Sequence, residues 1–276
     1  GLGDVYKRQL YYLAYQLLFI FLATGTDATI ALIGGADITA NFRPGTMAIS
    51  IGMLLSALAM TWHLVHFHYV KFNKESMYEV SKKIILLCIP LLLSAQFIAG
   101  ILNEALDLTD TNQELFISMS HNIFGVLSIA IVVPILEEVL FRGAIEGHLL
   151  RKGWSPKWAI LVSALIFGII HGNPAQIPFA FLIGLLFGWL YYRTGSLVPG
   201  IVGHIINNSF GAWTMFTATR EELSQTTMET LGTTITYILL VLAIIVFIGM
   251  YLYLNKYLPK PTNIQVKAIN EQDITI

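Results

Sequence analysis

Residues 115–150 read LFISMSHNIFGVLSIAIVVPILEEVLFRGAIEGHLL, a long apolar run with Glu137, Glu138 and Arg142 in its second half. A helix that crosses the hydrocarbon core of a bilayer needs about 20 apolar residues, so this run is long enough to span a membrane. Pro134 has no backbone N–H to donate and should kink the helix. The stretch therefore predicts a transmembrane helix that carries ionisable side chains inside the membrane.

The composition of the whole chain agrees with a membrane protein. Its 276 residues are 55% hydrophobic and only 12% charged, and the mean hydropathy is +0.68. Globular domains carry roughly 25% charged residues, so a soluble enzyme and a disordered protein are excluded. The 16 Lys and Arg nearly balance the 17 Asp and Glu, which gives no indication of a nucleic-acid partner. The single cysteine, Cys88, excludes a disulfide framework and a cysteine zinc site.

Other apolar runs with polar borders extend the prediction to an all-α polytopic membrane protein with about eight transmembrane helices. The predicted spans are Leu10–Gly25, Thr46–Val70, Ile84–Leu102, Leu115 to about Leu150, Trp158–His171, Ile177–Tyr192, Leu197–Phe216 and Thr233–Leu254. We expect one integral membrane domain over residues 1–258 and a short polar cytoplasmic tail over 259–276. The first nine residues read unlike the rest and carry no weight in this assignment, and we expect no cleavable signal peptide.

The Lys and Arg residues predict the orientation. With eight spans, all of them except Arg43 and Arg220 belong to one side of the membrane, and most of the Asp and Glu belong to the other. Cytoplasmic loops carry the excess of Lys and Arg. We therefore expect a multi-pass protein of the plasma membrane with both termini in the cytoplasm.

Ionisable side chains fall at similar depths on three predicted spans. Counted from the nearest cytoplasmic basic residue at about 1.5 Å per residue, Glu138, His171 and His204 lie about 17–21 Å deep. The hydrocarbon core is about 30 Å thick, so all three lie near its middle. Charged and polar groups at that depth are costly and usually functional. The alternative is that they only hold helices together by hydrogen bonds.

The spacing of these residues along their helices suggests a different role for each of them. Glu138 and Arg142 are four residues apart on one face and should pair. Glu137 points elsewhere and is left for general acid or base catalysis. His204 and Asn208 also share a face, where the Asn208 amide could donate to an oxyanion.

Two further patterns have structural interpretations. His63, His66 and His68 lie near the end of the second span among aromatic residues, which favours an interfacial aromatic belt over a second metal site. Gly184 and Gly188 form a small-xxx-small pair, which indicates close helix packing within the protein.

The residues over about 116–217 resemble a known family. EEVLFR at residues 137–142, FGIIH at 167–171 and HIINN at 204–208 are similar to the EExxxR, FxxxH and HxxxN motifs of the CPBP intramembrane peptidases. This family includes the CAAX prenyl endopeptidases and proteins of bacteriocin processing or immunity. All three motifs occur in order on separate spans, which is far more specific than any one of them.

The resemblance implies a helical membrane enzyme with its catalytic core at about 116–217 and a cavity open to the cytoplasm and the bilayer. Glu137 and His171 would activate a water, while His204 and Asn208 would hold the oxyanion. In the same way, Glu138 and Arg142 would support the site and Phe167 would pack it. A zinc ion bound by Glu137, His171 and His204 remains an alternative to metal-independent hydrolysis.

The predicted function is an intramembrane endopeptidase that hydrolyses a peptide bond of a membrane-associated peptide or protein, with or without a lipid anchor, such as a CAAX-type or leader peptide. A proton-coupled transporter is the alternative from another class, because Glu and His chains also form proton relays. A non-catalytic immunity or binding protein is a third. The lipid bilayer is the expected surrounding, and no nucleic acid is expected.

Overall fold

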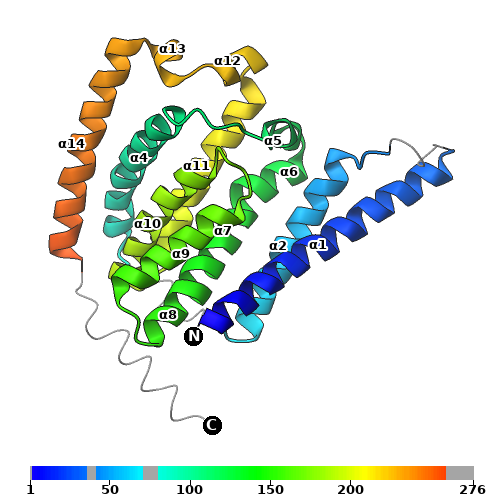
Figure 1. Ribbon diagram of the computed structural model, residues 1–276, viewed down its shortest axis with the longest axis horizontal. Helices are drawn as coiled ribbons and strands as arrows, with labels where there is room; N and C mark the ends of the chain where they lie inside the picture. The colour runs from blue at the N-terminus through cyan, green and yellow to red at the C-terminus, as the bar shows by residue number, and fades with distance from the viewer. Residues whose placement is uncertain (1, 36–41, 71–79, 259–276) are drawn as a thin grey trace, which may run out of the picture.

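The computed structural model describes residues 2–35, 42–70 and 80–258, and every regular element over these ranges is helical (Figure 1). The chain is a multi-pass all-α membrane protein, as predicted. Within these ranges, six helical segments are long and apolar enough to cross a membrane by length and composition. The predicted cytoplasmic tail, 259–276, lies outside the described residues.

Each predicted span corresponds to a helical segment. These are α1 (Leu2–Ile33), α2 (Thr46–His66), α4 (Lys82–Glu104), the composite segment Ile123–Arg151, α9 (Pro156–Ile170), α10 (Ile177–Thr194), α11 (Val198–Thr217) and α14 (Thr233–Tyr257). Of these, α9 has only 15 residues, and α11 is not among the six segments that meet the length and composition criteria. Helix α1 begins at Leu2, so the first residues continue the fold and Val5 is buried.

The fourth predicted span is where the expectation was partly wrong. The run from Leu115 is not one helix, because α5 (Gln113–Ser120) ends at His121 and a new helix begins after Asn122. The Asn122 side chain accepts a hydrogen bond from the Gly125 N–H at 2.7 Å, which caps that new helix. The long helical segment therefore starts at Ile123 instead of Leu115.

The segment Ile123–Arg151 alternates between α-helical and π-helical turns. It comprises α6 (Ile123–Leu127), η1 (Ser128–Val132), α7 (Val133–Glu138), η2 (Val139–Glu146) and α8 (Gly147–Arg151), where η marks π-helix. Pro134 lies at the start of α7, directly after a π-helical turn. π-Helical turns are rare and frequent at functional sites, and here they flank the two glutamates.

This segment forms the centre of the molecule. It is packed against α2, α9 and α11, while α10 pairs with α9. Helix α1 packs mainly on α2, and α14 packs on α4 at the opposite edge (Figure 1). The start of α1 and the end of α14 lie at the same end of the bundle, as an even number of crossings requires (Figure 1).

Two short helices with acidic residues lie between the end of α11 and the start of α14, and we call this end of the bundle the acidic end. They are α12 (Arg220–Ser224) and α13 (Thr227–Leu231), and each begins with a capping box. Glu222 accepts hydrogen bonds from the backbone N–H and the hydroxyl of Thr219, and these hold the pKa of the Glu222 carboxyl below its ordinary value. Thr226 acts in the same way on Glu229.

Candidate active site

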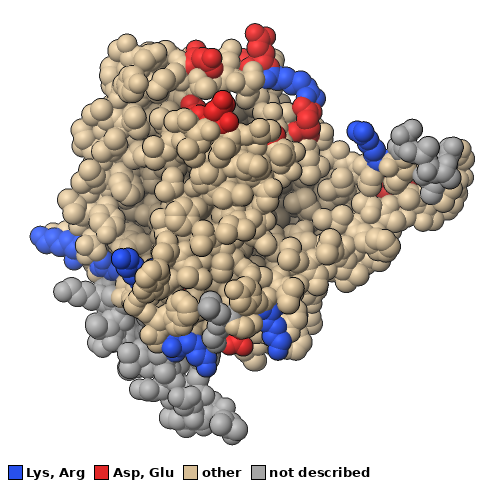
Figure 2. Space-filling view, in the orientation of Figure 1, with Lys and Arg blue, Asp and Glu red and all other residues tan. Residues whose placement is uncertain are grey.

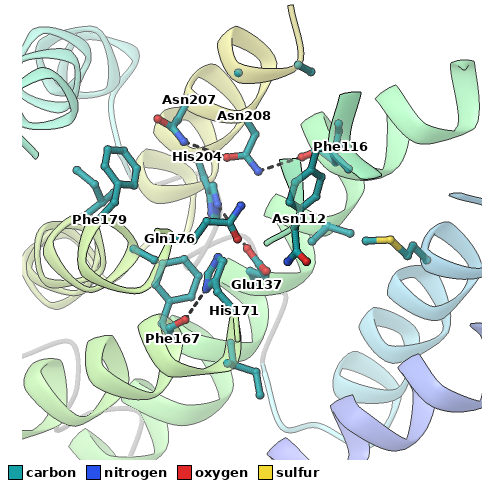
Figure 3. A pocket seen from close by; sticks show the side chains of 18 of the residues that line it. Asn112, Phe116, Glu137, Phe167, His171, Gln176, Phe179, His204, Asn207 and Asn208 are labelled. Atoms are coloured by element: carbon teal, nitrogen blue, oxygen red, sulfur yellow. Dashed lines mark hydrogen bonds and ion pairs between the residues drawn. The ribbon is translucent and has the colours of Figure 1, made fainter. Parts of the chain in front are cut away.

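A cavity of about 490 Å³ lies between α1 and α2 on one side and α9, α10 and α11 on the other (Figure 3). The predicted site residues that line it are Glu137, Phe167, His171, His204 and Asn208. Glu138 and Arg142 do not line the cavity and are buried directly behind it. The structure thus brings the three motifs together around one space.

His204 lies between the two adjacent glutamates. Its Nε2 is 3.4 Å from Oε2 of Glu137, and its Nδ1 is 3.1 Å from Oε1 of Glu138. Glu137 and His204 are only 6% and 5% exposed, so little water screens these contacts. The ring can donate to a carboxylate from both nitrogens when it is protonated.

The expected pair of Glu138 with Arg142 is present. Arg142 Nη1 donates to Glu138 Oε1 at 2.9 Å, and Nη2 donates to the carbonyl oxygen of Gly184 at 3.1 Å. The same Glu138 oxygen faces His204, so the pair extends to the histidine. The sequence spacing predicted the contact of Glu138 with Arg142. It gave no signal for the contact of Glu138 with His204, because His204 comes from a distant helix.

Aromatic rings enclose the charged groups. The Arg142 guanidinium lies 4.4 Å from the ring centre of Phe167 and 5.3 Å from that of Phe187. Phe167 also meets His171 and His204 edge to face, at 5.0 and 5.7 Å between ring centres. Phe167 therefore contacts Arg142, His171 and His204. Phe187, which also lies over Arg142, was not predicted.

His171 is held in one tautomer by the helix that carries it. It lies at the C-terminal end of α9, and its Nδ1 is 2.7 Å from the carbonyl oxygen of Phe167. A carbonyl can only accept, so the Nδ1–H donates and a neutral ring keeps its lone pair on Nε2. Gly172 follows with φ +61°, a left-handed conformation that ends the helix. His171 can therefore accept a proton through Nε2.

Asn208 is engaged on both sides of its amide. Its Nδ2 donates to the carbonyl oxygen of Ile129 at 2.9 Å, and its Oδ1 accepts from Asn207 Nδ2 at 3.0 Å (Figure 3). Ile129 belongs to the π-helical turn η1, so this unusual turn helps to orient the amide. An amide nitrogen carries two hydrogens, which leaves one for a bound group.

Three glycines make room for the buried charges. A Cβ at Gly200 would lie 2.6 Å from Oε2 of Glu138, and one at Gly184 would lie 3.2 Å from Nη2 of Arg142. A Cβ at Gly188 would lie 2.6 Å from Oε2 of Glu146. The predicted internal packing of Gly184 and Gly188 is confirmed, and the side chains next to them include the ionisable groups of Arg142 and Glu146.

Two buried polar residues near the site were not predicted. Glu146 is fully buried, and neither of its carboxyl oxygens has a hydrogen-bond partner among the described residues. Asn173, also fully buried, donates to Asp110 Oδ1 at 2.7 Å and accepts from the Thr111 N–H at 3.1 Å. Asn173 thus ties the loop after His171 to the loop that follows α4. The one signal in the sequence that could have identified Glu146 and Asn173 is their position close to the motifs.

The side chains considered above as zinc ligands are not arranged around one metal position over the described residues. Over the described ranges, no three His, Cys, Asp or Glu side chains are placed to hold a metal ion. At the site, Nδ1 of His204 contacts Glu138 at 3.1 Å, and its Nε2 lies 3.4 Å from Glu137. Near the second span, His63 contacts Tyr15 Oη at 3.1 Å and lies against the rings of Tyr11 and Tyr69.

Comparison with known proteins supports the resemblance seen in the motifs. The model of the family described as type II CAAX prenyl endopeptidase Rce1-like matches residues 119–210. This segment contains all three motifs, so the predicted resemblance is confirmed over it. No solved structure matches the chain significantly.

Individual relatives match over 81 to 122 residues of this chain. The membrane-embedded CAAX protease MroQ of Staphylococcus aureus (strain USA300) is 33% identical over 106 residues, which is 37% of this chain and 42% of MroQ. YdiL of Bacillus subtilis (strain 168), whose name assigns it provisionally to the membrane peptidases, is 38% identical over 81 residues, 29% of this chain and 33% of YdiL. The UPF0177 protein YxdF of Lactococcus lactis subsp. lactis (strain IL1403) is 28% identical over 122 residues, 44% of this chain and 63% of YxdF. The chain thus spans less than two thirds of each of these relatives.

Proposed function

We propose that this chain is an intramembrane endopeptidase that hydrolyses a peptide bond with a water activated by Glu137 and His171. The observation that carries the proposal is that one cavity is lined both by the buried carboxylate of Glu137 and by His171, whose Nδ1 donates to a carbonyl so that Nε2 can accept a proton. The matched family and the CAAX protease relative support a membrane endopeptidase.

In the proposed reaction, a water lies between Glu137 and His171 and loses a proton to one of them as its oxygen attacks the peptide carbonyl. The carbonyl oxygen becomes an oxyanion in a tetrahedral intermediate. The C–N bond then breaks, and the stored proton passes to the leaving nitrogen. The products are a new carboxyl terminus and a new amino terminus.

His204 and Asn208 stabilise the oxyanion in this mechanism. His204 keeps its orientation because Glu138 holds Nδ1 at 3.1 Å, and Arg142 in turn fixes Glu138. The second hydrogen of the Asn208 amide donates to the same oxygen. Donors that are held in place before the reaction cost no reorganisation when charge develops, and removing one typically lowers kcat by about 10²–10³-fold.

The test is cleavage by purified protein in detergent. A library of quenched fluorescent peptides that includes farnesylated CAAX peptides is incubated with wild type, Glu137→Gln and His171→Ala. The matched control is Glu221→Gln, the same change at an exposed glutamate outside the cavity. We expect cleavage by wild type and the control, and loss of turnover in both site variants with unchanged folding.

Equal cleavage by Glu137→Gln would overturn the proposed mechanism, and no cleavage by folded wild type would overturn the proposed activity. A parallel incubation with a chelator separates the zinc alternative. Full activity after metal removal is expected, whereas loss that returns on adding zinc would favour the metal-dependent form.

A further inference from the structure

The cavity lies in one half of the bundle. Helix α9 ends, α10 begins and α11 ends at the face that carries the acidic loops. The cavity is lined by the last turn of α9, by α10 from Phe179 to Phe187, and by α11 from His204 to Met215. The opposite end of α10, from Leu190 to Thr194, takes no part in the lining. The space thus extends from Glu137 towards the acidic face.

The cavity also reaches that face. Its lining includes Asn112, which directly precedes α5, and Gln176 in the loop between α9 and α10. Met215 lines it two residues before the end of α11. All three side chains are partly exposed. The mouth therefore lies among the loops at the acidic end.

The two ends of the bundle differ in charge. Acidic side chains gather at the top of Figure 2, over α12 and α13 and the end of α4, where Arg220 pairs with Glu114. Lysines and arginines gather at the lower end. Glu222 and Glu229 are ionised at neutral pH, since the Thr219 and Thr226 hydrogen bonds lower their pKa values further below the ordinary range of a glutamate. The excess of Lys and Arg marks the cytoplasmic side, so the acidic face is extracytoplasmic.

The lining carries little charge. Among the described residues, Glu137 is the one carboxylate that lines it, and no Lys or Arg does. Arg142 is only 1% exposed and is covered by the rings of Phe167 and Phe187. A carboxylate of the substrate would therefore lose its water beside Glu137 without gaining a cation, which is costly.

We propose that the site opens to the extracytoplasmic side and takes exported peptides, or outward-facing segments of membrane proteins, that are uncharged next to the cleaved bond. This inference rests on the proposed peptidase function. It differs from the cytoplasmic cavity that the family resemblance implied, because the cavity extends towards the acidic loops and away from the basic ones.

Access is tested by labelling single cysteines with a membrane-impermeant maleimide. Cys88 is buried and is the only cysteine, so Cys88→Ser gives a thiol-free background. Met215→Cys reports the mouth, Glu221→Cys the acidic face and Lys152→Cys the basic face. We expect the first two to react in right-side-out vesicles, and Lys152→Cys only in inside-out vesicles.

Reaction of Met215→Cys only in inside-out vesicles would overturn the proposal. So would a reversed pattern for the two face controls, or failure of Met215→Cys to react from either side when denatured protein reacts fully. Because this labelling needs no substrate, it tests access even if the peptidase activity is absent.

Substrate sidedness is tested with a quenched fluorescent peptide, uncharged around its cleavage site, that wild type cleaves in detergent. Right-side-out vesicles should cleave the added peptide, and inside-out vesicles should do so only after permeabilisation. Glu137→Gln should be silent in both. Placing Asp next to the cleaved bond should lower kcat/KM at least about tenfold. External cleavage by intact inside-out vesicles, or equal cleavage of the Asp peptide, would contradict the inference, whereas silence in detergent would refute the proposed function itself.

Discussion

Glu138 is the residue on which the polar groups converge, since one of its oxygens faces both Arg142 and His204. Glu138→Gln removes the charge that holds both partners. We expect kcat to fall by about 100-fold, because a misplaced catalytic group costs that much, with little change in KM because Glu138 does not line the cavity. Steady-state kinetics beside Glu221→Gln measure this. An unchanged kcat in Glu138→Gln would show that His204 needs no such support.

Asn208 allows a separate test at the same scale. Asn208→Ala removes the proposed oxyanion donor and also the hydrogen bond to Ile129. We expect a loss of about 10²–10³-fold in kcat, which is typical for one oxyanion donor. Asn207→Ala is the comparison, since it removes the amide that donates to Asn208 Oδ1 but leaves both hydrogens of the Asn208 amide in place. A variant that changes KM alone would mean that Asn208 binds substrate and does not stabilise the transition state.

The sequence predicted individual contacts only where they are local. Glu138 and Arg142 are four residues apart on one helix, so spacing alone predicted their pair. The contact of Glu138 with His204 joins residues from different helices, and a single sequence gives no periodicity for such a contact. Glu146 was missed because a glutamate near a predicted helix end is ordinarily solvated.

At the scale of elements, a glycine on α10 allows that helix to pack against Glu146. Gly188→Ala puts a Cβ 2.6 Å from the Glu146 carboxylate, so we expect a loss of about 1–3 kcal/mol in the free energy of unfolding, as for overpacked cores. Gly100→Ala, where nothing lies within 4 Å of the added Cβ, should be neutral or slightly stabilising.

The double variant Gly188→Ala/Glu146→Ala should recover part of the loss, since the clashing side chain is removed. Reversible unfolding of the purified protein in detergent measures these variants together with Glu146→Ala, which completes the double-mutant cycle. Additive effects in the double variant would show that Gly188 and Glu146 are not coupled.

The loop after α9 offers a prediction about positioning. Asn173→Ala breaks its bonds to Asp110 and Thr111, and the released loop should let His171 move. We expect kcat to fall about tenfold or more, since small misplacements of a catalytic group are costly. The pH dependence of kcat should also shift, which a purely structural loss would not produce. Asn103→Ala, which removes the bond to Ala175 in the same loop, is the matched comparison.

Helix boundaries were predicted well where polar residues border an apolar run. Predicted and observed starts agree at Thr46, Ile177 and Thr233, and α9 ends one residue before the predicted end. The fourth span failed because α5 is itself apolar, so hydropathy continues across the break at His121 and Asn122. The π-helical turns were not predicted, since they depend on packing around Pro134 and the glutamates.

At the scale of the whole molecule, depth along separate helices was informative. The sequence placed Glu138, His171 and His204 near mid-membrane. The two histidines line one cavity together with Glu137, the neighbour of Glu138. The direction in which that cavity opens could not be predicted, because it depends on how α1 and α2 stand beside α9, α10 and α11. The resemblance implied a cavity open to the cytoplasm, which is the side opposite to the one proposed here.

The central claim is that water activated at Glu137 cleaves a peptide bond. The most direct test is mass spectrometry of a peptide incubated in heavy-oxygen water with wild type, Glu137→Gln and Glu221→Gln. The account predicts that wild type and Glu221→Gln give a new carboxyl terminus that carries one heavy oxygen, and that Glu137→Gln gives none. The same labelled product from Glu137→Gln at the wild-type rate would contradict the account.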